Sequence, residues 1–135
     1  MTAWLPAALF ALLNFGLWGF FSKMAVSHID AKSALFFQSI GVIVVGFITL
    51  TLLDFKPSVE WKGLTFGLLT GLCLGVGCLF YLIAADKGKS STIVTLTSLY
   101  PLITILLSFV ILREGIHLKQ ALGIAFTLVA LYLLA

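Results

Sequence analysis

The sequence predicts an all-α transmembrane protein, folded as a bundle of five helices. Of its 135 residues, 61% are hydrophobic and only 10% are charged, whereas soluble domains usually carry about 25% charged residues. The apolar runs are too long for core helices, and each approaches the roughly 20 residues that cross a hydrocarbon layer. Short charged connections separate these runs. Together the observations indicate a polytopic α-helical membrane protein.

The predicted helices cover approximately residues 3–21, 33–53, 63–84, 92–112 and 116–135. Pro6 lies near the start of the first helix, where a proline is tolerated. Pro57 lies in the connection after the second helix and forbids its continuation. Trp61 precedes the third helix and fits the aromatic belt at a membrane interface.

Capping residues mark the later boundaries. Gly88 is predicted as the C-cap of the third helix, and Ser90 and Ser91 are the candidate N-caps of the fourth. Arg113 and Glu114 form a tight charged connection between the fourth and fifth helices. The five helices therefore follow one another with short loops, in a single domain over residues 1–135.

Several function classes find no support in the sequence. The basic residues are scattered singly, although the net charge is +3, so no nucleic-acid partner is expected. Cys73 and Cys78 lie five residues apart in one apolar run and do not face each other for a disulfide. The residues contain no paired carboxylates, nucleophile–histidine pair or metal-ligand cluster at bilayer depth. We therefore expect neither an enzyme, nor a cofactor, nor a metal. No signal peptide is expected, because the first apolar run is long enough to span.

Asn14 is the strongly polar side chain in the middle of the first helix. Ala7, Ala11, Asn14 and Trp18 share one face of that helix by their spacing. One interpretation is an interhelical hydrogen bond worth about 1 kcal/mol or less. The other is a substrate contact in a central cavity, which Trp18 favours because it lies one turn further along the same face.

The third helix carries a glycine every four residues, at Gly63, Gly67, Gly71 and Gly75. Such a stripe lets another helix backbone approach closely, so these residues are predicted to serve helix packing. Two other polar side chains remain ambiguous. Gln38, in the second helix, is expected at the membrane interface. Tyr81 can reach either a cavity or the headgroups.

Pro101 lies inside the fourth predicted helix, where it removes a backbone hydrogen bond and bends the helix. Thr97, Pro101, Thr104 and Ser108 form a polar stripe by their spacing, and Tyr100 lies beside them. Serine and threonine hydroxyls can also bond their own i−4 carbonyls in membrane helices, which is the ordinary interpretation. The proline within the stripe favours a cavity wall instead.

With the helices placed, the chain resembles a single EamA domain of the drug/metabolite transporter superfamily. The motifs that carry the resemblance are LWG at 17–19, AADKGK at 84–89, SLYP at 98–101, and Glu114 followed by Gln120 and Gly123. The resemblance covers essentially the whole chain, residues 1–135. Where the family often has glycine before the glutamate, this sequence has Arg113.

The resemblance implies half of an inverted-repeat transporter, because most relatives build a central substrate site from two such units. The expected function is secondary transport of small metabolites or amphipathic organic compounds by alternating access, as an integral multi-pass protein of the bacterial inner membrane. The expected substrate-binding residues are Asn14, Trp18, Thr97, Tyr100, Pro101 and Thr104. Asn14 cannot titrate, so proton antiport through that site is not expected. A non-transporting subunit of a larger membrane complex remains the alternative.

Loop charges bear on orientation. Five helices place Lys56, Lys62, Arg113 and Lys119 on one side of the membrane, and Lys23, Lys32, Lys87 and Lys89 on the other. Orientation follows the lysine and arginine bias of short loops, and here the two sides carry equal numbers. We therefore expect dual topology, with a second copy in inverted orientation as the partner, besides a small-molecule substrate and the lipid bilayer.

Overall fold

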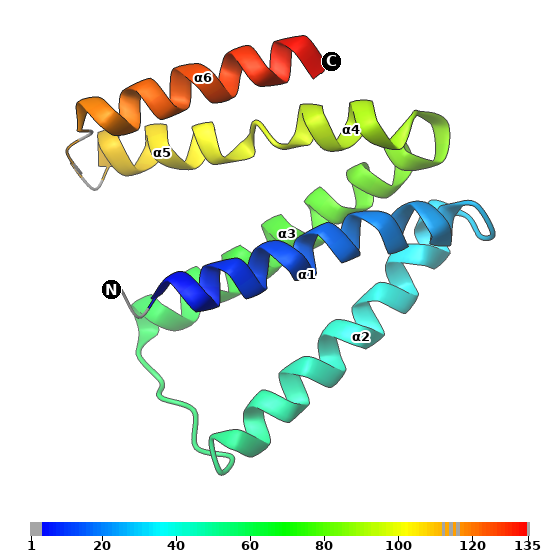
Figure 1. Cartoon of the computed structure of the whole chain (residues 1–135). Coiled ribbons are helices and arrows are strands. Elements are labelled where there is room, and N and C mark those ends of the chain that lie inside the picture. Colours follow the sequence, from blue (N-terminus) through cyan, green and yellow to red (C-terminus); the bar gives the residue numbers. More distant parts are fainter. Residues whose placement is uncertain (1–3, 112, 114, 116, 135) are drawn as a thin grey trace. The chain divides into compact units, whose positions relative to one another are not determined.

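A computed structural model describes residues 4–111, 113, 115 and 117–134, and every regular element in this part of the chain is a helix. The helices are α1 (Trp4–Val26), α2 (Ala31–Leu52), α3 (Trp61–Lys87), α4 (Ser90–Thr97), α5 (Tyr100–Ile111) and α6 (Leu118–Leu134) (Figure 1). The predicted all-α fold class is confirmed. The predicted fourth helix is divided into α4 and α5, and α3 continues to Lys87, beyond its predicted end.

Within the described residues, four stretches are long and apolar enough to cross a membrane: α1, α2, α3 and the combined span Ser90–Ile111. The 17 residues of α6 reach about 25 Å at 1.5 Å per residue, near the lower limit for a transmembrane helix. Contacts divide the chain into two units, residues 1–87 and 88–135. Each unit is therefore described by itself, and the single domain stays a prediction.

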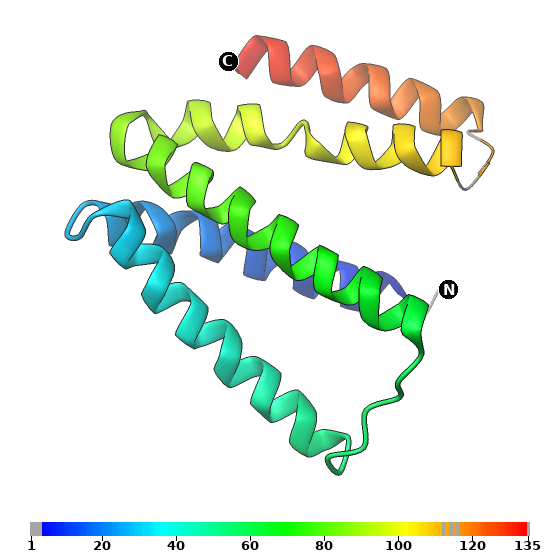
Figure 2. The same cartoon turned by 180° about the vertical axis from the view of Figure 1, so that it is seen from behind.

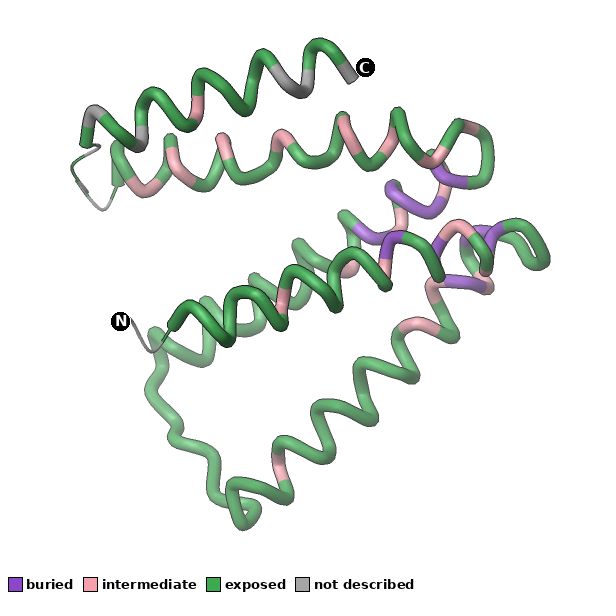
Figure 3. Tube along the Cα trace, viewed as in Figure 1, coloured by how far each residue is buried: buried purple, intermediate pink, exposed green. Residues whose placement is uncertain are grey.

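In the first unit the core lies at one end. The helices α1, α2 and α3 meet near the α1–α2 loop, and α2 diverges from α1 toward its other end (Figures 1 and 2). The buried positions lie at this meeting end (Figure 3), at Gly19, Ser22, Ala34, Tyr81, Leu82 and Ala85 among others. Elsewhere large apolar side chains face outward, as expected for surfaces that lipid covers.

Asp30 begins α2 as its N-cap residue. One carboxylate oxygen accepts hydrogen bonds from the backbone N–H groups of Lys32 and Ser33, and the other accepts from the Ser33 hydroxyl. These bonds satisfy donors that the first helical turn would otherwise leave open. They also lower the pKa of Asp30 below its usual value, chiefly through the Ser33 hydroxyl.

Asp54 follows the C-terminal end of α2 in a left-handed conformation, with φ of 49°. Its N–H donates to the Thr51 carbonyl at 3.0 Å, and the Phe55 N–H donates to the Leu50 carbonyl at 3.1 Å. This pair of bonds is a Schellman motif, in which glycine is the preferred residue at the Asp54 position. The motif ends α2 before Pro57 is reached.

In the second unit a break at residues 98 and 99 separates α4 from α5, which run nearly end to end (Figure 1). Pro101 accounts for its position. The proline has no N–H to donate to the carbonyl of Thr97, four residues earlier, and its ring would clash with that carbonyl in a continuous helix. Helix α4 accordingly ends at Thr97. The bend predicted at Pro101 is thus a complete interruption of the helix, just before the proline.

Candidate functional site

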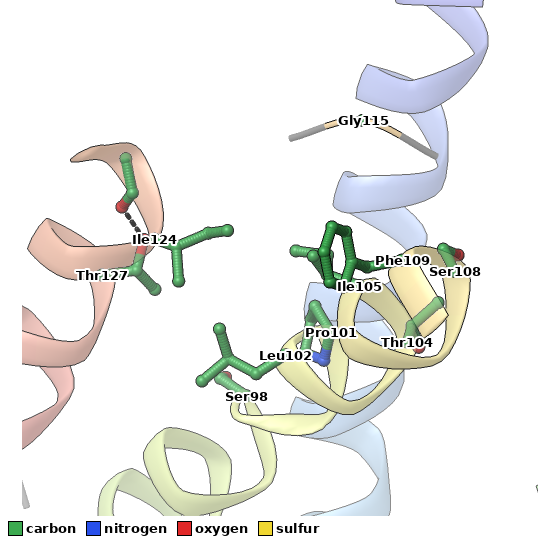
Figure 4. Close-up of a pocket in the computed structure, with 11 residues that line it drawn as sticks. Ser98, Pro101, Leu102, Thr104, Ile105, Ser108, Phe109, Gly115, Ile124 and Thr127 are labelled. Atoms are coloured by element: carbon green, nitrogen blue, oxygen red, sulfur yellow. Dashed lines mark hydrogen bonds between the residues drawn. The ribbon is translucent and has the colours of Figure 1, made fainter. Parts of the chain in front are cut away.

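A groove of about 490 Å³ lies in the second unit, between α5 and α6 (Figure 4). Its polar lining residues are Ser98, Thr104, Ser108 and Thr127, and Pro101 lines it at the helix break. Leu102 and Ile124 extend into the space between the two helices (Figure 4). Among the described residues, the lining contains no charged side chain.

The hydroxyls near this break bond to their own helices. Thr97 donates to the Ile93 carbonyl at 2.8 Å, and Ser98 donates to the Val94 carbonyl at 2.7 Å. Thr104 makes a longer bond of 3.4 Å to the Tyr100 carbonyl. These three hydroxyls therefore bond to carbonyls of their own helices, as the ordinary interpretation of serine and threonine in membrane helices predicts. It does not exclude a ligand, because a hydroxyl that donates keeps oxygen lone pairs that can accept.

The predicted site residues of the first helix lie in the first unit. Asn14 is exposed, and its side-chain N–H donates to the Phe10 carbonyl of its own helix at 2.8 Å. Trp18 instead contacts both neighbouring helices. Its indole nitrogen donates to the Gln38 side-chain oxygen at 3.2 Å, and its ring lies 4.6 Å from the Tyr81 ring.

A second cavity, of about 240 Å³, lies beside Trp18. Its lining includes the polar residues Ser22 and Gln38, the aromatic residues Phe21 and Phe37, and Leu82 of α3. Gln38 was expected at the membrane interface, and that expectation did not include its bond to Trp18 or its place in this lining. Spacing along the sequence could not reveal it, because the contact joins two helices whose relative rotation is set by packing.

The predicted residues are thus only partly brought together. Pro101 and Thr104 line the larger groove, and Trp18 lines the smaller cavity. Thr97 and Tyr100 flank the helix break without lining the groove, and Asn14 lines neither space. The shared site for all six residues stays a prediction.

The glycine stripe of α3 faces open space. A Cβ atom added at Gly63, Gly67, Gly71 or Gly75 would meet nothing within 4 Å. Within the described part of the first unit these glycines meet no other helix, and the close helix packing predicted for them stays a prediction.

Comparison with known proteins places this arrangement in context. The sequence model of the EamA-like transporter family matches residues 2–135. An uncharacterized protein of Methanocaldococcus jannaschii is 34% identical over 125 residues, which are 90% of this chain and 88% of that protein. An uncharacterized transporter of Synechocystis sp. is 38% identical over 74 residues, which are 55% of this chain and 22% of that protein. No solved structure matches.

Proposed function

We propose a transport mechanism for this chain, which belongs to the EamA-like transporter family. The chain is an integral multi-pass membrane protein and a transporter of the drug/metabolite superfamily. It is a secondary transporter of small metabolites or amphipathic organic compounds, and it works by alternating access. Two copies in inverted orientation form the complete transporter. Its place is the inner membrane of a bacterium.

The helix interruption before Pro101 carries the proposal. Interrupted helices in secondary transporters place irregular backbone and polar groups beside the substrate. Here the interruption adjoins a groove of about 490 Å³ with hydroxyls around it. An interruption of this kind also lets α4 and α5 change their relative angle without breaking regular helical hydrogen bonds, which alternating access requires.

The chemistry of the site favours substrates with hydrogen-bond donors. Thr97 and Thr104 use their own protons within the helix, so their oxygens can only accept from a ligand. The proposed substrate-binding residues remain Asn14, Trp18, Thr97, Tyr100, Pro101 and Thr104. Trp18 and Tyr100 add aromatic surface for the apolar part of an amphipathic compound.

Two observations support a second copy. The basic residues of the loops are balanced between the two sides, so neither orientation is favoured. The second relative is several times longer than the 74 residues that align, whereas alignment to the first covers 88% of its length. The second relative thus contains more sequence than one such unit, and two copies of the unit would supply a comparable amount of structure.

Flux into proteoliposomes tests the proposal. The purified full chain is reconstituted, and uptake is measured for ethidium as an amphipathic probe and for a mixture of radiolabelled amino acids as small metabolites. Uptake of either probe above protein-free vesicles is expected, and the double variant Asn14→Ala, Thr97→Ala should lower it at least tenfold. Thr49→Ala is a matched control, because its hydroxyl also bonds within its own helix, to the Val45 carbonyl.

Two results would contradict the proposal. Uptake that survives the double variant unchanged would remove Asn14 and Thr97 from the site. Absence of uptake, together with a stable heteromeric partner on purification, would instead favour a subunit of a larger membrane complex.

A further inference from the structure

We infer that the 240 Å³ cavity beside Trp18 is a binding site for a hydrogen-bond acceptor, such as an ester or amide carbonyl, carried on a flat apolar body. The inference deepens the proposed function, on which it rests for the role of Trp18 in substrate binding. It assigns Ser22 and Gln38 as the donors of this site. The cavity lies wholly within the first unit.

Ser22 is the first observation. Its side chain lines the cavity and is only 5% exposed. No other described residue accepts its proton, in contrast to the hydroxyls of Ser39, Thr49 and Thr65, which all donate to carbonyls of their own helices. Among the described residues no fully buried polar side-chain atom lacks a partner, so the Ser22 oxygen is reached from the cavity and is not sealed in the core. A ligand oxygen in the cavity would accept the proton of that hydroxyl.

Gln38 provides the second donor. An indole N–H can only donate, so its bond to Gln38 fixes the amide with the oxygen toward Trp18. The amide nitrogen is thereby turned away from the indole, and it makes no hydrogen bond to another described residue. Gln38 and Ser22 line the same cavity, so we assign the amide N–H groups as donors to a ligand there, together with the Ser22 hydroxyl.

The rest of the lining selects the body of the ligand. The aromatic and aliphatic surface comes from Trp18, Phe21, Phe37 and Leu82, and no described side chain in the lining is charged. A cavity of about 150 Å³ accommodates benzene, so this one has room for a single ring with a small polar substituent. A ligand carrying a net charge would have no countercharge in the lining, which disfavours it.

Binding can be measured through Trp18 itself. The chain has three tryptophans, and Trp4 and Trp61 are 63% and 81% exposed, so replacing both with phenylalanine leaves Trp18 as the sole indole reporter. The full chain is purified in a maltoside detergent, which has no carbonyl group. Its emission is then titrated with acetanilide, which bears a carbonyl, and with ethylbenzene, which has no acceptor.

A saturable change in Trp18 emission is expected with acetanilide, and a weaker, non-saturating change with ethylbenzene. Ser22→Ala should raise the Kd for acetanilide about fivefold, the effect of one lost hydrogen bond. Ser39→Ala is the matched control, since its hydroxyl bonds to the Leu35 carbonyl and it does not line the cavity. Gln38→Leu should weaken binding as well. Equal thermal unfolding of the two serine variants verifies that both are folded.

The inference is overturned if Ser22→Ala binds acetanilide as tightly as Ser39→Ala does, or if ethylbenzene binds equally well. Because no gradient or flux enters the measurement, this failure is separate from a failure of transport in proteoliposomes. Loss of uptake in Asn14→Ala, Thr97→Ala with no saturable acetanilide binding would leave transport standing without this site.

A lipid ester carbonyl has the same chemistry as the proposed ligand, and a second arm separates the two sources. The acetanilide titration is repeated in nanodiscs of diester and of diether phosphatidylcholine. Equal affinity in both supports a free small-molecule ligand. Weaker affinity in the diester lipid supports occupation by lipid carbonyls, and in either case the acceptor site stands.

Discussion

The indole nitrogen of Trp18 donates a hydrogen bond to the side-chain oxygen of Gln38 at 3.2 Å, and this bond joins α1 to α2 where the two helices meet. The residues lie 20 positions apart in the sequence. The ring of Trp18 also lies 4.6 Å from the ring of Tyr81 on α3. One side chain of α1 thus contacts both other helices of the first unit.

A double-mutant cycle measures the Trp18–Gln38 bond. The variants Trp18→Phe and Gln38→Leu should show a coupling free energy of roughly 0.6 kcal/mol, the typical value for an interhelical hydrogen bond in a membrane protein. Phenylalanine preserves an aromatic ring beside Tyr81. Reversible unfolding in mixed SDS micelles provides the free energies. Additive effects of the two substitutions would show that the bond is absent in solution.

The glycine stripe predicts a contact between copies. Gly67→Leu, Gly71→Leu should leave the helix content of the chain unchanged, because a Cβ atom added at either position meets nothing within 4 Å. The double variant should nevertheless weaken self-association at least tenfold. Energy transfer between labelled chains in liposomes measures this. Gly46→Leu on α2, where an added Cβ also meets nothing, is the control. Unchanged energy transfer in the double variant would remove the stripe from any interface.

The left-handed residue after α2 predicts a stabilising substitution. Asp54→Gly should raise the free energy of unfolding by about 1 kcal/mol, because glycine adopts positive φ without the steric cost that other residues incur. Asp54→Ala removes the same charge but keeps that cost, so it separates conformation from charge. Equal stability of the two variants would assign the effect to the carboxylate near the helix C-terminus.

The N-cap of α2 predicts a dependence on pH. Hydrogen bonds to the carboxylate lower the pKa of Asp30 from 3.8 in the folded chain. A lowered folded-state pKa means that the stabilisation is present above about pH 3.8 and is lost as the pH falls through the folded value. Asp30→Asn should abolish the part of the stability that is lost at acidic pH. Thermal unfolding between neutral and acidic pH measures it, and identical acid sensitivity in both proteins would contradict the assignment.

Balanced loop charges predict dual topology. Reporters that are active on only one side of the membrane, fused to the C-terminus, should each give signal. Ser58→Lys, Val59→Lys in the second loop should drive uniform insertion and abolish transport. Co-expression with a copy carrying Ser27→Lys, His28→Lys in the first loop should restore it. Signal from one reporter alone in the unaltered chain would disprove dual topology.

Local features of the sequence were sufficient to predict the helices. Apolar runs of about 20 residues predict spanning helices because the bilayer core imposes that length. The helix break was predictable at Pro101 because the missing N–H and the ring clash act within one turn. Its form as a full interruption at residues 98 and 99 was not, since a proline in a helix can be accommodated by a bend.

Contacts between helices were beyond the sequence. Gln38 was predicted at the interface and Tyr81 was ambiguous, yet both contact Trp18. Spacing shows which residues share a face of one helix, but it does not show the rotation of that helix against its neighbours. That rotation is set by the packing of three helices together.

By itself, then, the sequence determined an all-α membrane protein with a helix distorted at Pro101, because hydrophobic length and proline geometry act locally. Its short motifs added the resemblance to an EamA domain. Only the tertiary structure decided that Ser22 is buried beside a cavity and that Trp18 orients the Gln38 amide. Those facts depend on side chains from separate helices meeting in space, and no local spacing encodes that meeting.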